Sequence, residues 1–244
     1  MKQEQTLHRF YYPHLKLHIG TAILDGQEAM HVIKVLRLGV GDSIELIDGE
    51  GAMAQADILS VSKKSCELII SPFQTFNLPY NMEIKLAFGL IKSVDRLAFL
   101  IEKCTELGVT EFYPLITDNA ERRSLNLDKI KAASIAALKQ SRQYWLPRIN
   151  PPTPLKTFVT NTASIEGAKY IAHCRSNNAP HLAKVYMKTE PVTIMIGPEG
   201  DFSESELDLC LENNIKPVSL GTQRLRSETA AITAIVSLTT VMEL

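Results

Sequence analysis

Residues 192–231 read VTIMIGPEGDFSESELDLCLENNIKPVSLGTQRLRSETAA and contain two successive strand–loop–helix patterns. The apolar run VTIMIG and the shorter run PVSL predict strands, and each leads through a loop containing glycine into a helix. The spacing of Ser203 and Glu206 predicts a capping box at the start of the first helix. Open α/β sheets bind ligands where strand ends open into helix starts, so this stretch predicts a ligand site.

The sequence upstream continues this alternation of strands and helices. Strands are predicted for IKLAFGL (84–90), EFYPLIT (111–117) and KYIAHC (169–174). Helices are predicted from a cap at Ser93 to a stop at Gly108, and over residues 128–143 and 228–243. The pattern indicates a parallel α/β sheet, and the last helix is apolar or small nearly all round, so we expect it to be buried.

The N-terminal region has a different, β-rich pattern. Short strands are predicted for LKLHI (15–19), SIELIDG (43–49), AMAQADILSV (52–61) and CELIIS (66–71), with one short helix over residues 27–36. Such strands suggest a small barrel, and PFQTFNLP (72–79) suggests the linker that follows it. We therefore expect two domains, residues 1–72 and residues 73–244.

Composition narrows the class of protein. The 244 residues are 45% hydrophobic and 22% charged, which is typical of a globular chain. No apolar run is long enough for a membrane span and the N-terminus lacks a signal-peptide pattern, so we expect a cytoplasmic protein without a membrane partner. The four cysteines are widely separated and form no C-x-x-C pair, so neither a metal site nor a disulfide framework is expected.

The two loops of the opening stretch carry the candidate chemistry. Gly197 and Gly200 would let the backbone approach a ligand closely, although an ordinary glycine turn before a capped helix explains them equally well. In the second loop, Arg226 precedes a helix N-terminus, where the helix dipole disfavours a cation. Binding of an RNA phosphate or base would explain this arginine; a solvated surface arginine is the alternative. Neither loop has a P-loop or G-x-G-x-x-G motif, which argues against ATP hydrolysis and dinucleotide chemistry.

Taken together, GPEGDFSESEL and LGTQRLRSETAAI resemble the C-terminal signature of the SPOUT-class RNA methyltransferases, specifically the RsmE family that makes 3-methyluridine in small-subunit ribosomal RNA. The resemblance extends over nearly the whole chain through IEKCTELGV, ERRS, KQSRQYWLPRINPP, HRFYY and HVIKVLRLGVGDSIELIDGEG, in the family's order. Two positions depart from it. The family loop usually reads GPEGG where this chain has Asp201, and Gln223 stands where LGxRILR has its first arginine, with Arg224 one place later.

The resemblance implies a SPOUT-type parallel α/β sheet with a C-terminal trefoil knot, preceded by a PUA-like RNA-binding β-barrel. It also implies a homodimer, with S-adenosylmethionine held largely by backbone groups of three loops and with no metal. The cofactor-binding positions that it implies are His173, Gly197, Glu199, Gly200, Leu220, Gly221, Leu225, Arg226, Glu228, Thr229 and Ala230.

Methylation at N3 of uridine requires a deprotonated acceptor. A cation stabilises the uridinate anion, and a carboxylate can accept its proton. We expect Arg226 and Arg9 in the first role, and Glu199 or Glu228 in the second, with helix-end capping as the alternative for both carboxylates.

RNA phosphates would be contacted by dispersed arginines, some of which would instead be solvated or ion-paired. The candidates are Arg9, Arg37, Arg122, Arg123, Arg142 and Arg148, the last two flanking the potential stacking residues Tyr144 and Trp145. The expected partner is small-subunit ribosomal RNA or the assembled subunit. Two alternatives are a 2'-O-ribose methyltransferase of the same superfamily and a non-catalytic, RNA-binding ribosome-assembly factor.

Overall fold

The computed structural model describes residues 7–17, 20–174 and 178–244 and contains two compact units. The first unit extends to Leu78 and includes Leu138–Leu146, and the second comprises Pro79–Ala137 and Pro147–Leu244. This division differs from the boundary expected after residue 72, because Gln74–Thr75 still pairs with a strand of the first unit. The return of Leu138–Leu146 to that unit was not expected from the sequence.

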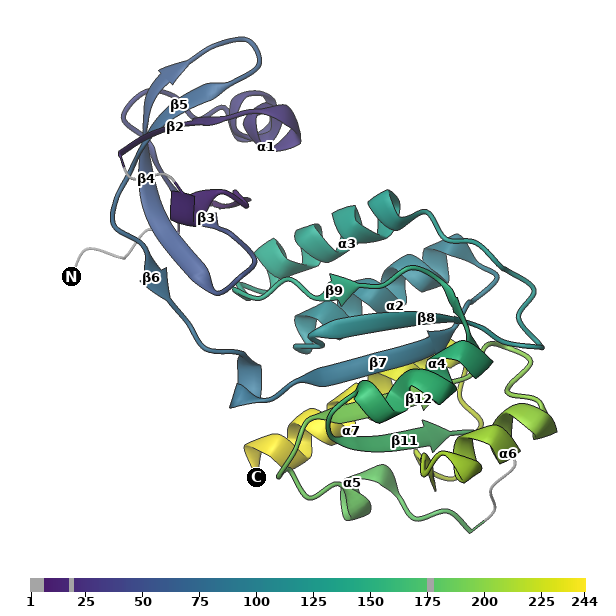
Figure 1. Cartoon of the computed structure of the whole chain (residues 1–244). Coiled ribbons are helices and arrows are strands. Elements are labelled where there is room, and N and C mark those ends of the chain that lie inside the picture. The colour runs from purple at the N-terminus through teal and green to yellow at the C-terminus, as the bar shows by residue number, and fades with distance from the viewer. Residues whose placement is uncertain (1–6, 18–19, 175–177) are drawn as a thin grey trace. The chain divides into compact units, whose positions relative to one another are not determined.

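The first unit is built on a six-stranded sheet in the order β1-β3-β4-β5-β2, with β6 paired to β4 (Figure 1). Its strands are β1 (Arg9–Tyr11), β2 (Gly20–Leu24), β3 (Ser43–Ile47), β4 (Ala52–Val61), β5 (Cys66–Ile70) and β6 (Gln74–Thr75). Its helical segments are the 3-10 turn Leu15–Leu17, α1 (Gly26–Met30) and the π-helix His31–Leu36, which continues α1. β1 pairs with β3 in parallel, and the other pairings are antiparallel.

Alternating residues of these strands face one core. Ile44 and Leu46 of β3, and Leu68 of β5, are fully buried there with Phe10 and Leu15. The strands predicted near residues 43, 52 and 66 are therefore confirmed. The strand predicted for residues 15–19 is wrong where the structure describes it, because Leu15–Leu17 forms a 3-10 turn that inserts Leu15 into the core; residues 18–19 lie outside the described residues.

The second unit contains a parallel sheet in the order β10-β8-β7-β12-β11-β13, with β9 paired to β8. Its strands are β7 (Ile84–Gly89), β8 (Glu111–Ile116), β9 (Arg148–Ile149), β10 (Thr153–Pro154), β11 (Ala168–Ala172), β12 (Val192–Ile196) and β13 (Lys216–Val218). The helices are α2 (Val94–Glu106), α3 (Leu127–Gln140, whose last three residues are counted with the first unit), α4 (Leu155–Asn161), α5 (Leu182–Val185), α6 (Glu204–Glu212) and α7 (Ser227–Glu243), with 3-10 turns at Pro79–Asn81 and Thr162–Ser164.

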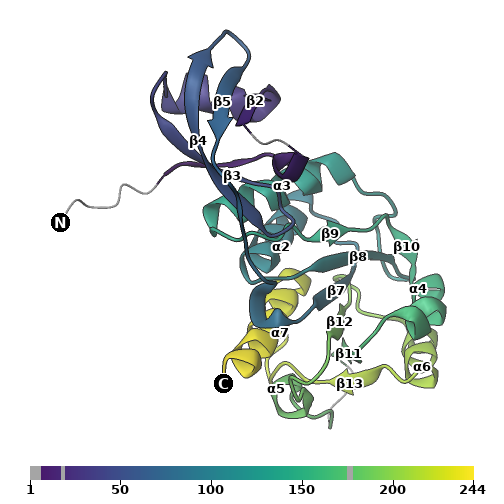
Figure 2. The same ribbon diagram turned by 60° about the vertical axis from the view of Figure 1, so that its left-hand side comes forward.

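Helices cover both faces of this sheet (Figures 1 and 2). On one face, Leu86 and Phe88 of β7 pack in a core with residues of α2 and α7 such as Leu100 and Ile235. On the other face, Ala87 and Met195 share a core with residues of α4 and α6, including Phe158 and Cys210. This three-layer α/β arrangement confirms the predicted parallel sheet.

Several local predictions are confirmed. Ser93 caps α2 by accepting from the Arg96 amide, and Ser203 with Glu206 forms the full capping box of α6. Two are wrong in detail. The helix predicted to reach residue 143 ends at Gln140, since Arg142 adopts a left-handed φ of 58°. The last helix is also not buried all round, because the Val236 side chain is 43% exposed. Within the described residues, no helix has both the length and the apolar character for a membrane crossing.

Candidate functional site

Three loops leave the carboxyl edge of the second unit's sheet at the same level. In the parallel register, Ala172 at the end of β11 lies beside Ile196 at the end of β12 and beside Val218 at the end of β13. The segments that begin at His173, Gly197 and Ser219 therefore start side by side. This is the position at which a parallel α/β sheet binds ligands, and these are the three loops that the sequence indicated.

The loop after β12 packs closely against its neighbours. A Cβ atom at Gly89 in β7 would lie 2.4 Å from Cδ of Pro198, so only glycine fits the strand there. A Cβ at Gly200 would lie 2.9 Å from Cβ of Asn119, whose side-chain amide donates to the Gly200 carbonyl at 3.0 Å. The glycines thus allow close backbone packing, which holds the loop in place at the sheet edge.

Asp201 closes this loop in a left-handed conformation, with φ of 60°. Its Oδ2 accepts a hydrogen bond from the Cys174 amide at 3.0 Å, and its Oδ1 accepts from the Phe202 amide at 2.9 Å. Sequence reasoning noted the departure from glycine but missed these contacts. The ability of aspartate to adopt left-handed backbone was the available signal.

Glu199 is exposed and bonded to a neighbouring loop. Its carboxylate oxygens accept from the Lys92 amide at 3.3 and 3.4 Å. The Lys92 carbonyl accepts from Arg122 Nη2 at 2.9 Å, and the Lys92 ammonium pairs with Glu121 at 2.7 Å, which raises the pKa of Lys92. The ERRS segment predicted to contact RNA therefore lies beside the expected cofactor loop, with Arg123 and Ser124 exposed.

The loop after β13 presents exposed cations and open backbone. Gly221 has a φ of 130°, and a Cβ built on it would meet no atom of the described chain within 4 Å. Arg224 and Arg226 are exposed, and Arg226 occupies the N-cap position of α7 without a side-chain cap. Gln223 and Thr229 are also exposed, whereas Leu220, Leu225 and Ala230 are half-buried, as is His173 in the first loop.

Glu228 lies buried in the first turn of α7 and is 7% exposed. Its Oε1 is 3.7 Å from Nε of Arg96 in α2, a residue that sequence reasoning did not single out. Its Oε2 is buried without a hydrogen-bond partner among the described residues. A carboxylate at a helix N-terminus is stabilised by the helix dipole. Helix-end capping, the alternative to a proton-acceptor role, therefore explains part of the position of Glu228.

Arg9, predicted as a catalytic and RNA-binding residue, is enclosed by contacts within the first unit. The guanidinium pairs with Glu45, donates to the Gln143 carbonyl at 3.0 Å and lies 4.8 Å from the centroid of the Tyr144 ring. Its side chain is 4% exposed. These contacts engage the guanidinium within the first unit.

The aromatic pair predicted to stack on RNA bases is also used within the first unit. The Tyr144 ring stacks on Phe76, with centroids 3.8 Å apart, and the Trp145 indole donates to the Phe76 carbonyl at 3.0 Å. These contacts hold the returning segment against the sheet, and both side chains are half-buried. The same segment also carries Arg142, whose Nη2 donates to the Leu7 carbonyl at 3.3 Å.

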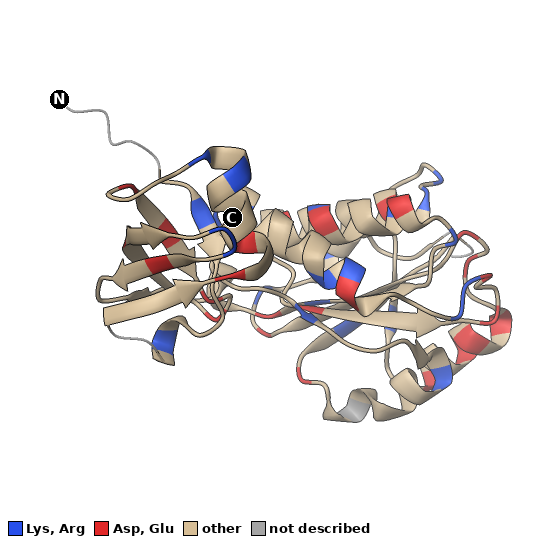
Figure 3. Cartoon of the chain, turned by 90° about the horizontal axis from the view of Figure 1, so that it is seen from above, with Lys and Arg blue, Asp and Glu red and all other residues tan. Residues whose placement is uncertain are grey.

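The remaining arginine candidates lie in different surroundings. Arg37 is exposed at the end of the π-helix with a φ of 56°. Arg148 is 75% exposed at the side chain and lies 3.5 Å from Glu111. Basic and acidic segments are interspersed along the ribbon, in keeping with the near balance of 26 basic and 27 acidic residues (Figure 3). Within the described part of the chain, no cluster of metal-ligating side chains occurs.

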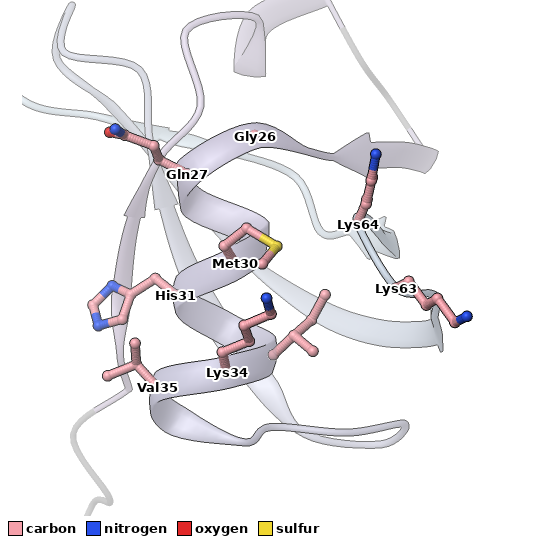
Figure 4. Close-up of a pocket in the computed structure, with 9 residues that line it drawn as sticks. Gly26, Gln27, Met30, His31, Lys34, Val35, Lys63 and Lys64 are labelled. Carbon is pink, nitrogen blue, oxygen red and sulfur yellow. The ribbon is translucent and has the colours of Figure 1, made fainter.

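An open groove in the first unit has an apolar floor and basic side chains (Figure 4). It runs between the continuous α1 and π-helix and the turn that joins β4 to β5. Met30 and Val35 contribute apolar surface, while Lys34, Lys63 and Lys64 supply ammonium groups. No carboxylate lines the groove among the described residues, so its charge suits an anion.

Comparisons with known proteins give consistent matches. A family model described as RNA methyltransferase domain matches residues 78–239, and one described as RNA methyltransferase PUA domain matches residues 24–71. Ribosomal RNA small subunit methyltransferase E of Rickettsia conorii is 32% identical over 210 residues, which cover 84% of each chain.

Solved structures match along the whole chain. The probable rRNA-methyltransferase of Porphyromonas gingivalis is 31% identical with a TM-score of 0.90, covering 97% of this chain and 99% of its own. Ribosomal RNA small subunit methyltransferase E of Neisseria gonorrhoeae, solved with S-adenosyl methionine bound, is 29% identical with a TM-score of 0.87, covering 96% and 98%.

Proposed function

The chain belongs to the RNA methyltransferase family, and on that premise we propose that it methylates N3 of a uridine in small-subunit ribosomal RNA, with S-adenosylmethionine as methyl donor. One observation carries the proposal: three loops begin side by side at the carboxyl edge of the sheet, in a fold shared with a relative solved with this cofactor bound. Methyl transfer from a sulfonium needs positioning of the two reactants.

The loops fit a cofactor held mainly by main-chain groups. Gly221 is approachable from the side on which a Cβ would stand, because no atom of the described chain lies within 4 Å of that position, and close contacts at Gly197 and Gly200 pack the neighbouring loop against the chain. When bound, the cofactor supplies an electrophilic methyl group. The residues proposed to hold it are His173, Gly197, Glu199, Gly200, Leu220, Gly221, Leu225, Arg226, Glu228, Thr229 and Ala230.

The acceptor nitrogen must lose its proton before or during transfer. The exposed Arg226 guanidinium at the start of α7 is proposed to stabilise the developing uridinate. Glu199 is the better placed proton acceptor because it is exposed at the loop, whereas the Glu228 side chain is only 10% exposed. Arg9 is not retained in this role, since its contacts in the first unit enclose it.

RNA contacts are proposed at exposed basic groups of each unit. In the second unit, Arg122 and Arg123 lie in the segment that contacts the loop after β7. In the first unit, the groove with Lys34, Lys63 and Lys64 combines ammonium groups with apolar surface, which suits a phosphate next to a nucleobase. Arg37, Arg142 and Arg148 are further candidates.

Two features implied by the family resemblance, the trefoil knot and the homodimer, are proposed as well, together with the cytoplasmic location that composition predicted. The knot rests on the resemblance of the C-terminal signature; the chain leaves edge strand β13 and returns to pack α7 on β7, β12 and α2. Exposed apolar side chains on α2 and α7 support the dimer.

The test is methylation of small-subunit ribosomal RNA, free or in assembled subunits, taken from cells that lack this protein. We expect incubation with the protein and S-adenosylmethionine to produce 3-methyluridine, detected by mass spectrometry of nucleosides. A ribose-methylated nucleoside instead would overturn the base assignment. Methylation of neither substrate would favour a binding factor, and calorimetry would then show whether the cofactor pocket is functional.

A further inference from the structure

We propose that Asp201 is a positioning residue that ties together the loops after β11 and β12 at the cofactor site. The inference rests on the proposed function, because these loops are two of the three proposed to hold S-adenosylmethionine. The tie consists of one carboxylate between two backbone amides, with Oδ2 at 3.0 Å from the Cys174 nitrogen and Oδ1 at 2.9 Å from the Phe202 nitrogen.

The backbone at Asp201 explains why few residue types could take its place. Its φ of 60° is a conformation that glycine adopts freely and that aspartate and asparagine tolerate better than other residues. The family that the sequence resembles usually has glycine here. Glycine would adopt the same backbone conformation but would leave the Cys174 amide without this acceptor. The departure from the family pattern therefore adds a contact between loops.

The tie acts where the strand pairing no longer restrains the chain. The ladder between β11 and β12 ends with the pair Ala172 and Ile196. Beyond it, the contact from Asp201 to Cys174 joins the two loops, while Asn119 holds the Asp201 carbonyl from the loop after β8 at 3.1 Å. Charge-assisted hydrogen bonds of this kind are stronger than neutral ones, so the spacing of the loops is fixed before the cofactor binds.

The electrostatics of Cys174 report on the same contact. Its thiol pKa is raised, first by burial and then by the negative charge of Asp201, while the positive charge of Arg224 opposes the shift. Arg224 belongs to the loop after β13. Asp201 and Arg224, from the loops after β12 and β13, therefore both act on Cys174 in the loop after β11, and this exposed thiol offers a probe of their arrangement that does not depend on activity.

The first experiment compares cofactor binding by Asp201→Gly and Asp201→Asn with the wild type. Glycine keeps the backbone conformation and removes the tie, so we expect the Kd for S-adenosylmethionine, measured by calorimetry, to rise about tenfold. Asparagine keeps one oxygen acceptor, so it should restore part of the affinity. In methylation assays, KM for the cofactor should rise while kcat and KM for RNA stay near wild type. Asp208→Asn, which removes a charge from the exposed face of α6, is the matched control.

The second experiment measures alkylation of Cys174 by iodoacetamide at fixed pH, with peptide mass spectrometry to identify the site. The other three cysteines are buried, so alkylation should be selective for the exposed Cys174 thiol. Removing the carboxylate should lower the thiol pKa and speed alkylation in Asp201→Asn but not in Asp208→Asn. This measurement uses Asp201→Asn and therefore does not require Asp201→Gly to fold.

The outcomes separate the two proposals. If wild type binds S-adenosylmethionine and Asp201→Gly, correctly folded, binds it equally well or more tightly, Asp201 has no positioning role. If wild type binds none, the proposed function fails, and unchanged alkylation in Asp201→Asn would then disprove the contact itself.

Discussion

At the scale of single residues, Glu199 has an observed contact and a proposed catalytic role, which a conservative substitution can separate. It bonds the Lys92 amide and it lies exposed in a proposed cofactor loop. Glutamine can still accept from that amide but cannot take a proton. We therefore expect Glu199→Gln to lower the rate of methyl transfer about 100-fold or more, with cofactor affinity near wild type. Single-turnover methylation and calorimetry check this, with the exposed Glu212→Gln as control; an unchanged rate would leave Glu199 only its contact with Lys92.

For Arg9 we expect a substitution to lower the stability of the fold and not to act directly on the rate of methyl transfer. Replacing it with alanine removes the contacts to Gln143 and Tyr144 and leaves the Glu45 carboxylate, 14% exposed, without its cation. Breaking such a pair from one side costs about 3 kcal/mol, and denaturant unfolding monitored by Trp145 fluorescence should show a loss of that size. Arg123→Ala, at an exposed position, should change stability by less than about 0.5 kcal/mol. Equal stability of both variants would contradict the role assigned to Arg9.

At the scale of elements, the turn between β4 and β5 presents Lys63 and Lys64 at the groove beside α1. Two phosphates neutralised by these lysines would contribute about 1.4 to the slope of log affinity against log salt for single-stranded RNA. We expect Lys63→Ala/Lys64→Ala to reduce the slope by that amount and to raise KM for RNA. Cofactor Kd should not change, and the exposed pair Lys129→Ala/Lys131→Ala on α3 serves as control. If both double variants showed the same slope of log affinity against log salt, the groove would not be part of the RNA-binding surface.

Elements also show which parts of the fold are predictable from sequence. Ser93 and the pair Ser203 and Glu206 bond to amides within three residues, so their short spacings predicted the starts of α2 and α6. Arg9 bonds partners 36 and 134 residues away, and no local pattern encodes such contacts. For the same reason, the three loops could be located from strand and glycine patterns, but the contact of Asp201 with Cys174, 27 residues away, could not.

At the scale of the whole molecule, the surface of α2 and α7 raises the question of subunit association. These helices pack against each other on one face of the second unit's sheet, yet Phe99 of α2 and Val236 of α7 are 47% and 43% exposed. Large apolar side chains on adjacent helices suit a self-complementary interface. In such an interface a twofold axis buries both copies of each side chain, one from each subunit.

We therefore expect the wild type to sediment as a dimer at micromolar concentration and Val236→Asp to sediment as a monomer. Each Val236 buried at the interface would contribute about 1.5 kcal/mol or more, and two copies would change together, so the dimer Kd should rise at least about 100-fold. Analytical ultracentrifugation over a dilution series measures this directly. Leu59→Asp places the same charge at an apolar position of β4 that is 42% exposed in the first unit, and it should leave the dimer intact. A wild type that is monomeric throughout the series while still binding S-adenosylmethionine would show that the cofactor site is complete within one chain, and the exposed faces of α2 and α7 would then need a different explanation.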